Sequence, residues 1–274
     1  MQKWQCRYAP SLGALEDTPD NIWGTKPYLD EFQDTVFMGM YGLNDFYSLW
    51  RHKGRKAILW CGSDIQHFLL GYWLDDEGKM RVHPSQLASW IDTYCENYVE
   101  NEVEQVALRS VGIRSKVIPS FLGDVSKYSV TYTQSDTPKL YTSVSGDNYE
   151  LYGWDKIAGL AKENPNVEFH LYGSHKPFPT PYANMIDHGR VPKEQMNSEI
   201  QSMQGCLRLT TFDGFSEIVA KALLWGQWPV SLIEYPHTIR PDGISALTQI
   251  NHANIKGREW LLATVNKYPW NIHV

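Results

Sequence analysis

The stretch "TTFDGFSEIVAKALLWGQWPVSLI" (residues 210–233) contains the local pattern that decides the fold of this chain. A polar turn leads into a helix-forming segment that stops at Gly226, and a short apolar run then predicts a strand. Ser216 is placed to cap a helix that begins at Glu217. A strand-like run at 205–212 comes directly before the turn, so the segment predicts one repeat of a parallel α/β sheet.

The same alternation of strand, turn and helix extends over both halves of the chain. Buried strands are expected at 35–42, 57–60, 140–146, 167–174, 205–212 and 228–233. A further short strand is expected within 115–124, closed by Pro119. A helical pattern from 84 to 111, shared by one or two helices, is followed by a polar, turn-rich stretch. The pattern predicts an α/β protein of two Rossmann-like, doubly wound domains facing a cleft, with a boundary near residue 122. The domains are residues 1–122 and 123–274. The amphipathic tail either crosses back onto the first domain or covers the second sheet.

Composition excludes several classes of partner. The 274 residues are 42% hydrophobic and carry a formal net charge of −6, with no basic block, so we expect no nucleic-acid partner. No apolar run approaches the roughly 20 residues of a membrane span. The first 20 residues have no signal-peptide core, which indicates a cytoplasmic location. The oligomeric state is left open.

Small polar residues gather where the predicted strands end. In doubly wound sheets, ligands bind beyond the carboxyl ends of the strands, and glycine there lets backbone N–H groups approach closely. Four turns qualify: Ser143 to Gly146, Gly173–Ser174, Thr211 to Ser216 and Gly62 to Asp64. The helix that begins after Ser216 favours an anion such as a diphosphate. Asp213 instead suits vicinal sugar hydroxyls, although a simple turn is the open alternative. The combination indicates a nucleotide sugar.

The segment "FDGFSEIVAKALLWGQWPVS" resembles the donor-binding signature of retaining glycosyltransferases of the GT-B fold, the family 4 group. Asp213 stands at the first acidic position, Gly214 and Phe215 follow, and Gly226 keeps its spacing. Further similar segments are "YGWDKIAGLAKENPNVEFHLYGS", "HGRVPKEQM", "LWCGSDIQ" and "CENYVENEVEQVALRSVGIRSKVIPSF". The resemblance covers roughly residues 35 to 235 and implies an abbreviated N-terminal domain.

The resemblance implies transfer of a sugar from a nucleotide diphosphate to an acceptor hydroxyl, with retention and without a cofactor. The chain has no D-x-D motif, so no metal is expected. Asp64 and Asp213 are the candidate catalytic residues, Asp64 as an orienting group or weak base toward the acceptor, with a turn or helix cap as its alternative. Gly62 and Ser63 are candidates for the acceptor. The donor candidates are Ser145, Gly146, Gly173, Ser174, Arg190, Val191, Gly214, Phe215, Ser216, Glu217 and Lys221.

Three positions depart from the family pattern. Lys221 replaces the second acidic residue, Tyr152 stands near the expected lysine, and Cys61 replaces the acceptor-side histidine. An i,i+4 ion pair with Glu217 is the other interpretation of Lys221. The diphosphate cation is left open among Lys156, Lys176, Arg190 and Lys221. Two alternatives therefore stand beside a transferase: a catalytically inactive relative that binds nucleotide or glycan or supports a partner enzyme, and a sugar-nucleotide epimerase.

Overall fold

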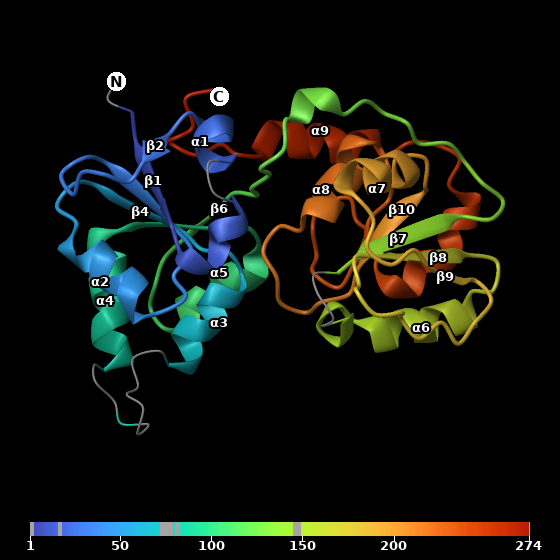
Figure 1. The fold of residues 1–274 in the computed structure, drawn as a ribbon, viewed down its shortest axis with the longest axis horizontal. Helices are drawn as coiled ribbons and strands as arrows, with labels where there is room; N and C mark the ends of the chain where they lie inside the picture. The colour runs from blue at the N-terminus through green and yellow to red at the C-terminus, as the bar shows by residue number, and fades with distance from the viewer. Residues whose placement is uncertain (1–2, 16–17, 72–78, 80–82, 145–148, 274) are drawn as a thin grey trace. The chain divides into compact units, whose positions relative to one another are not determined.

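The computed structural model describes residues 3–15, 18–71, 79, 83–144 and 149–273, which form two compact units. The first unit comprises Met1–Gly123, Phe212–Phe215 and Thr264–Val274, and the second comprises Asp124–Thr211 and Ser216–Ala263. Figure 1 shows a sheet flanked by helices in each unit. In the described part of the chain, no helix has the length and apolar character needed to cross a membrane.

Within the described residues, the sheet of the first unit has six parallel strands in the order β2-β1-β3-β4-β5-β6. These strands are β1 (Gln5–Tyr8), β2 (Lys26–Pro27), β3 (Thr35–Met38), β4 (Lys56–Leu59), β5 (Glu96–Val99) and β6 (Lys116–Val117). The helices are η1 (Pro10–Leu15), α1 (Thr18–Trp23), α2 (Leu43–Arg51), α3 (Ser63–Leu70), α4 (Pro84–Tyr94) and α5 (Glu102–Ser110).

Both faces of the first sheet are covered, which explains the nearly continuous apolar sequence of its central strands. Successive side chains on a strand point to opposite faces. Phe37 and Ile58 therefore enter a core cluster on one face, while Ala57 and Leu59 enter a second cluster on the other. That second cluster includes Trp270, so the C-terminal segment completes the core of the first unit.

The second unit has five described strands, also parallel, in the order β11-β10-β7-β8-β9. They are β7 (Lys139–Ser143), β8 (Glu168–Tyr172), β9 (Met185–Asp187), β10 (Gly205–Arg208) and β11 (Val230–Ser231). The helices are η2 (Val125–Lys127), η3 (Tyr149–Tyr152), α6 (Trp154–Glu163), α7 (Lys193–Ile200), α8 (Glu217–Leu224), η4 (Pro241–Gln249) and α9 (Ile255–Thr264). Leu140, Phe169 and Leu207 are fully buried in one core cluster and join the three central strands.

The predicted α/β class with two Rossmann-like sheets is confirmed, and the expected strands appear as β3, β4, a short β6, β7, β8, β10 and a short β11. The helical prediction from 84 to 111 is wrong in its middle, because Glu96–Val99 is strand β5 and lies between α4 and α5. Strands β1, β2 and β9 were also not predicted. Each of these four strands has only two to four residues, too few to show a clear period.

Candidate functional site

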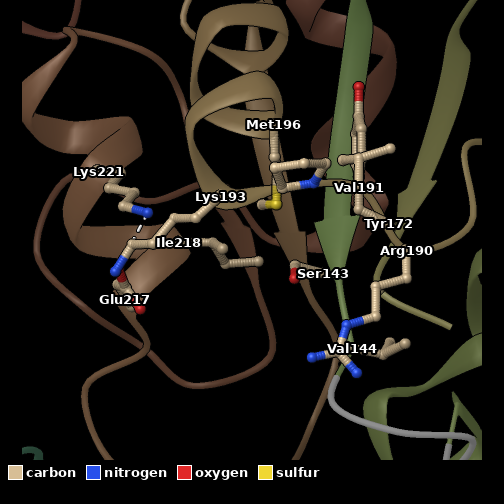
Figure 2. Close-up of a pocket in the computed structure, with 12 residues that line it drawn as sticks. Ser143, Val144, Tyr172, Arg190, Val191, Lys193, Met196, Glu217, Ile218 and Lys221 are labelled. Atoms are coloured by element: carbon tan, nitrogen blue, oxygen red, sulfur yellow. Dashed lines mark ion pairs between the residues drawn. The ribbon is translucent and has the colours of Figure 1, made fainter. Parts of the chain in front are cut away.

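The second unit contains a pocket of about 670 Å³ at the carboxyl ends of its central strands. Strands β7 and β8, the loop before α7, and the first turns of α7 and α8 all contribute to it (Figure 2). The lining residues are Ser143, Val144, Tyr172, Gly173, Arg190, Val191, Pro192, Lys193, Met196, Glu217, Ile218 and Lys221. A cavity of this size lies within the range that holds drug-sized ligands and cofactors.

Gly173 allows the ends of β7 and β8 to approach each other closely. Its backbone has φ of +103°, a left-handed conformation that favours glycine. A Cβ atom at this position would collide with the carbonyl oxygen of Val144. The amide nitrogen of Gly173 donates to the carbonyl oxygen of Gly189 at 2.8 Å, which ties the loop before α7 to the same strand end. The pocket floor therefore depends on a glycine at this position.

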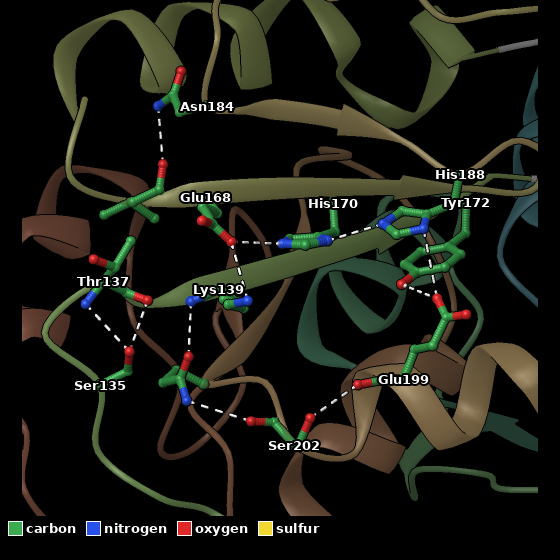
Figure 3. A network of polar contacts seen from close by, with 12 residues as sticks. Ser135, Thr137, Lys139, Glu168, His170, Tyr172, Asn184, His188, Glu199 and Ser202 are labelled. Atoms are coloured by element: carbon green, nitrogen blue, oxygen red, sulfur yellow. Dashed lines mark hydrogen bonds and ion pairs between the residues drawn. The ribbon is translucent and has the colours of Figure 1, made fainter.

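A polar network holds the aromatic ring of Tyr172 at the pocket (Figure 3). The Tyr172 hydroxyl donates to Glu199 Oε2 at 2.8 Å, and the His188 ring stacks on the tyrosine with centroids 4.3 Å apart. His188 Nε2 lies 2.9 Å from His170 Nδ1, so one imidazole must donate and the other accept. His170 Nε2 in turn lies 3.2 Å from Glu168 Oε2. Glu168, His170 and Tyr172 alternate along β8 and so share one face of the strand.

Burial sets the protonation of this network. It raises the pKa of the Tyr172 phenol above its usual range, and the Glu199 carboxylate adds to the effect, so the hydroxyl remains a donor. Burial lowers the pKa of His170, although the nearby Glu168 opposes the shift. His170 is therefore neutral at neutral pH, and its hydrogen bond to the second imidazole needs at least one neutral ring.

Two lysines share one carboxylate at the pocket rim (Figure 2). Glu217 Oε1 lies 2.9 Å from Lys221 Nζ and 3.0 Å from Lys193 Nζ. Lys221 also donates to Asn197 Oδ1 at 2.9 Å, and its side chain is only 4% exposed. Burial lowers the pKa of Lys221, while Glu217 opposes that shift. Burial acts to raise the pKa of Glu217, but the two ammonium groups more than offset it and leave the pKa below its usual range.

The pocket lining has an excess of positive charge. Arg190, Lys193 and Lys221 line it together with one carboxylate, that of Glu217. Arg190 Nη1 lies 2.5 Å from His175 Nε2, which fixes the side chain of the arginine from outside the lining. The lining thus has three cationic side chains and one carboxylate, at the ends of parallel strands and beside the beginning of α8. This arrangement suits a ligand with several negative charges.

The structure brings together part of the predicted donor set. Gly173, Arg190, Val191, Glu217 and Lys221 line the pocket. The predicted Glu217–Lys221 ion pair is present. Tyr172 and Lys193 line the pocket but were not predicted. Lysine at the first turn of a helix is not by itself a site signal, and a tyrosine ending a strand suggests only core packing.

Other predicted donor residues lie outside the pocket lining. Ser174 is buried, and its hydroxyl closes a turn with the backbone of Lys176. Ser216 occupies the N-cap position of α8 in extended backbone, but its side chain makes no capping hydrogen bond. Lys156, one of the cation candidates, donates to the carbonyl oxygen of Leu209 at 3.3 Å. Ser145 and Gly146 lie outside the described residues.

Asp213, Gly214 and Phe215 belong to the first unit, where they pack against the turn after β4. A Cβ atom at Gly62 would lie 2.7 Å from the Gly214 amide nitrogen and 3.2 Å from the Asp213 carbonyl carbon. The turn Gly62 to Asp64, which is predicted to contact the acceptor, and the segment Asp213–Phe215 of the signature are thus direct neighbours. The residues that follow this segment in α8 line the pocket of the second unit.

Asp64 lies fully buried beneath the same turn. Its carboxylate accepts backbone N–H groups from Met40, Cys61 and Ile65, each at 2.9 Å. Burial raises the pKa of Asp64 to about 6, against the opposing effect of those hydrogen bonds. These contacts fit the second interpretation of Asp64, as a turn or helix cap, because its carboxylate joins the backbone after β3 to the backbone after β4.

The turn after β5 supplies buried polar residues that the sequence analysis missed. Glu100, Asn101 and Glu104 are all buried. Asn101 Oδ1 accepts the Glu104 amide at 3.0 Å, and Glu104 Oε2 accepts the Glu100 amide at 2.7 Å. The Asn101 cap of α5 has a sequence signal, an Asn followed three residues later by a Glu. The helical pattern that the sequence shows from 84 to 111 hides this signal.

Among the described residues, no group of three or more His, Cys, Asp or Glu side chains is arranged to hold a metal ion.

No protein-family profile matches the chain. No curated protein sequence matches it either. Solved structures do resemble it. TarM superposes with a TM-score of 0.58 at 12% identity, covering 92% of this chain and 54% of TarM. Sucrose-phosphate synthase from Thermosynechococcus elongatus gives 0.57 at 10% identity, covering 84% of this chain and 69% of that one. The pneumococcal O-GlcNAc transferase GtfA, in complex with UDP and GlcNAc, gives 0.50 at 12% identity, covering 85% and 54%.

These likenesses show that the chain has the fold of GT-B glycosyltransferases, which confirms the predicted fold. The chain spans about half the length of TarM and of GtfA. At these identities the comparisons establish the architecture, and the chemistry has to be argued from the residues of this chain.

Proposed function

We propose that this chain binds a nucleotide diphosphate sugar in the pocket of its second unit and transfers the sugar to an acceptor hydroxyl. The observation that carries the proposal is the cationic lining by Arg190, Lys193 and Lys221 at the carboxyl ends of β7 and β8. Ligands of doubly wound sheets bind at such strand ends, and a diphosphate is the polyanion that this charge suits.

In the proposed reaction, the bond between the anomeric carbon and the β-phosphate oxygen breaks, and a bond to the acceptor oxygen forms on the same face of the sugar. The acceptor proton passes to the leaving diphosphate. Arg190, Lys193 and Lys221 stabilise the negative charge that develops on that group. The contact between Asp213 and the sugar hydroxyls stays a prediction from the sequence. The fold supports this proposal because solved glycosyltransferases share it.

The test is a panel of UDP-glucose, UDP-N-acetylglucosamine and GDP-mannose, assayed for nucleotide release with and without glycan acceptors. Acceptor-dependent release of UDP or GDP supports the proposal. Isomerisation of the sugar without an acceptor would instead support an epimerase. If no donor binds, the proposal is wrong.

A second candidate function is a relative that binds the nucleotide without transferring a sugar. The Glu217–Lys221 pair favours it, because a lysine occupies the second acidic position of the signature and engages the neighbouring carboxylate. Saturable binding of UDP or UDP-glucose, with no turnover in the presence of any glycan acceptor, would select this candidate.

A further inference from the structure

His170 and His188 form a row between two carboxylates in the second unit (Figure 3). His188 Nε2 lies 2.9 Å from His170 Nδ1, and its Nδ1 lies 3.5 Å from Glu199 Oε2. At the other end of the row, His170 Nε2 lies 3.2 Å from Glu168 Oε2. The two imidazoles therefore make three polar contacts in sequence, from the carboxylate on β8 to the carboxylate on α7.

Both carboxylates can only accept hydrogen bonds, because they are ionised. Burial acts to raise the pKa of Glu168, but hydrogen bonds from its neighbours more than offset it and leave the pKa below its usual range. Hydrogen bonds from Gln195 and Tyr172 lower the pKa of Glu199. Each end of the row therefore needs an N–H group from the imidazole beside it.

The three contacts require three protons on the four ring nitrogens. His170 Nε2 and His188 Nδ1 each need a proton to face their carboxylates, and the contact between the rings needs one more. Two neutral imidazoles hold only two protons, so the complete row carries one positive charge. Burial lowers the pKa of His170, so the charge belongs to His188, which then donates from both nitrogens.

The titratable groups around His188 come from strands β7, β8 and β9 and from helix α7. They are His170 and Tyr172 on β8, Glu199 on α7, Asp187 and Arg190 in the adjoining sequence and, behind His170, Glu168 and Lys139. The Asp187 carboxylate accepts two backbone N–H groups, and the Arg190 guanidinium contacts His175. Glu199 is therefore the carboxylate that directly balances a charge on the His188 ring.

Helix α7 connects this row to the pocket. Lys193 and Met196 line the pocket, and Glu199 follows at the same three-residue spacing, so the three side chains lie along one side of the helix. Tyr172, another lining residue, donates to the Glu199 oxygen that His188 contacts. The charged ring thus holds the end of α7 against the end of β8, together with the pocket wall that carries Lys193.

We propose that His188 in its charged form is a positioning residue for the donor pocket, and that this ring takes up a proton from the solvent when the donor binds. This inference rests on the proposed function. His188 lies outside the pocket lining and acts through Glu199 and α7. Without the proton, one carboxylate faces a bare ring nitrogen and α7 is held less firmly. Because coupling between two sites is reciprocal, a pocket that the charged ring organises must in turn favour the charged ring.

The test is titration calorimetry of the full chain with UDP-glucose at about pH 7, in buffers of different ionisation enthalpy, which counts the protons taken up on binding. Both phosphates of UDP-glucose are esterified, so its charge does not change near neutral pH as that of UDP does. We expect uptake of a fraction of one proton. The affinity should fall about three- to tenfold from about pH 6 to about pH 8, up to the effect of one hydrogen bond to a charged group. GDP-mannose takes the place of UDP-glucose if the panel selects it.

Two variants separate this role from a merely structural one. His188→Gln keeps a donor and an acceptor but cannot carry the charge, and Glu199→Gln keeps an oxygen for the Tyr172 hydroxyl but loses the charge opposite the ring. Both should bind UDP-glucose without proton uptake and with little dependence on pH. A structural role would instead lower the affinity at every pH and leave its pH dependence as in the wild-type chain. His252→Gln, at an exposed position outside the pocket, is the control and should behave as the wild-type chain does.

Nitrogen-15 spectra of the histidine rings test the proton count without ligand and without a variant. At about pH 6 we expect His188 to be protonated on both nitrogens and His170 on Nε2 alone. Donor binding without proton uptake, an unchanged pH dependence in His188→Gln, or two neutral rings at about pH 6 overturns the positioning role. If the wild-type chain binds neither UDP-glucose nor GDP-mannose, the proposed function fails and the linkage to the donor fails with it. The titration of the wild-type chain distinguishes that failure from the others.

Discussion

Lys221 and Glu217 lie one turn apart on α8, and their ion pair joins Nζ to Oε1 at 2.9 Å. The lysine is nearly buried, whereas the glutamate remains 54% exposed and also binds Lys193. The ion pair therefore keeps an ammonium group at the pocket that would otherwise be expensive to bury. An incoming diphosphate can share both lysines, since each ammonium has three donors.

Replacing Lys221 should weaken nucleotide binding more than it weakens the fold. In Lys221→Met, we expect the affinity for UDP to fall about tenfold, the usual cost of one charge-assisted hydrogen bond. The free energy of unfolding should change by less than about 1 kcal/mol, because removing a buried ammonium also removes its desolvation cost. Calorimetric titration and urea unfolding measure the two quantities. Lys162→Met, at an exposed position on α6 outside the pocket, is the matched control.

Gly173 should not tolerate a side chain. Gly173→Ala places a Cβ against the Val144 carbonyl oxygen at a φ that alanine rarely adopts, so we expect a loss of about 2 kcal/mol or more in unfolding free energy. The control is Gly159→Ala on α6, where a Cβ meets nothing within 4 Å. That change should raise helix stability by up to about 1 kcal/mol. Similar thermal unfolding midpoints for the two variants would contradict the claim that the close approach of β7 and β8 requires a glycine at position 173.

The buried carboxyls of the first unit should make the chain less stable as the pH rises. Burial raises the pKa of Glu100 and of Glu104 above the usual carboxyl value. The charge of Asp213 adds to the shift at Glu100, and the charge of Glu100 adds to the shift at Glu104. The folded chain then holds more protons than the unfolded chain above about pH 4.3, so stability falls as the pH rises through the folded pKa values. Urea midpoints measured from about pH 5 to 9 should fall, and Glu100→Gln should flatten the slope.

The exposed neighbour Glu102 provides the control for that experiment. Glu102→Gln should leave the pH slope as it is in the wild-type chain. A slope in Glu100→Gln that equals the wild-type slope would show that the buried carboxyl does not titrate as its surroundings require.

We expect the histidine network to stabilise the fold less as the pH falls. Burial lowers the pKa of His170 in the folded chain, so stability is complete above the usual histidine value of about 6.5 and is lost as the pH falls below it. Protonation of both rings also breaks the His170–His188 hydrogen bond, which needs one acceptor. We expect His170→Gln to be less stable at neutral pH but to show a shallower acid slope in thermal unfolding. Equal acid slopes would contradict this assignment.

Most of the second unit was predictable because its strands are short, largely buried runs that lead into turns of small residues. The run from Leu140 to Ser143 and the run that leads into Gly173 stand out in this way, and both reach the pocket. The first unit was harder. Strand β1 contains Gln5, which is buried because the backbone of Leu29 and Asp30 satisfies its side chain. Such distant partners leave no local pattern.

Strand β5 was missed for a related reason. Asn97 is buried in it, and its Oδ1 accepts the indole N–H of Trp60, the residue after β4, at 3.2 Å. In the sequence this polar residue resembles the exposed face of a helix, and helices lie on both sides. The positions of Glu100 and Asn101 depend on that strand, so their hydrogen bonds to the backbone of the segment Asp213–Phe215 could not be inferred before the strand was known.

Hydrogen exchange in the presence and absence of UDP, measured along the full chain, tests the central claim most directly. The account predicts saturable slowing of exchange in three places: the end of β7 at 143–144, the loop and helix start at 190–196, and the first turns of α8 at 217–221. UDP that binds and slows exchange elsewhere, with these three segments unchanged, would contradict the assignment of the pocket.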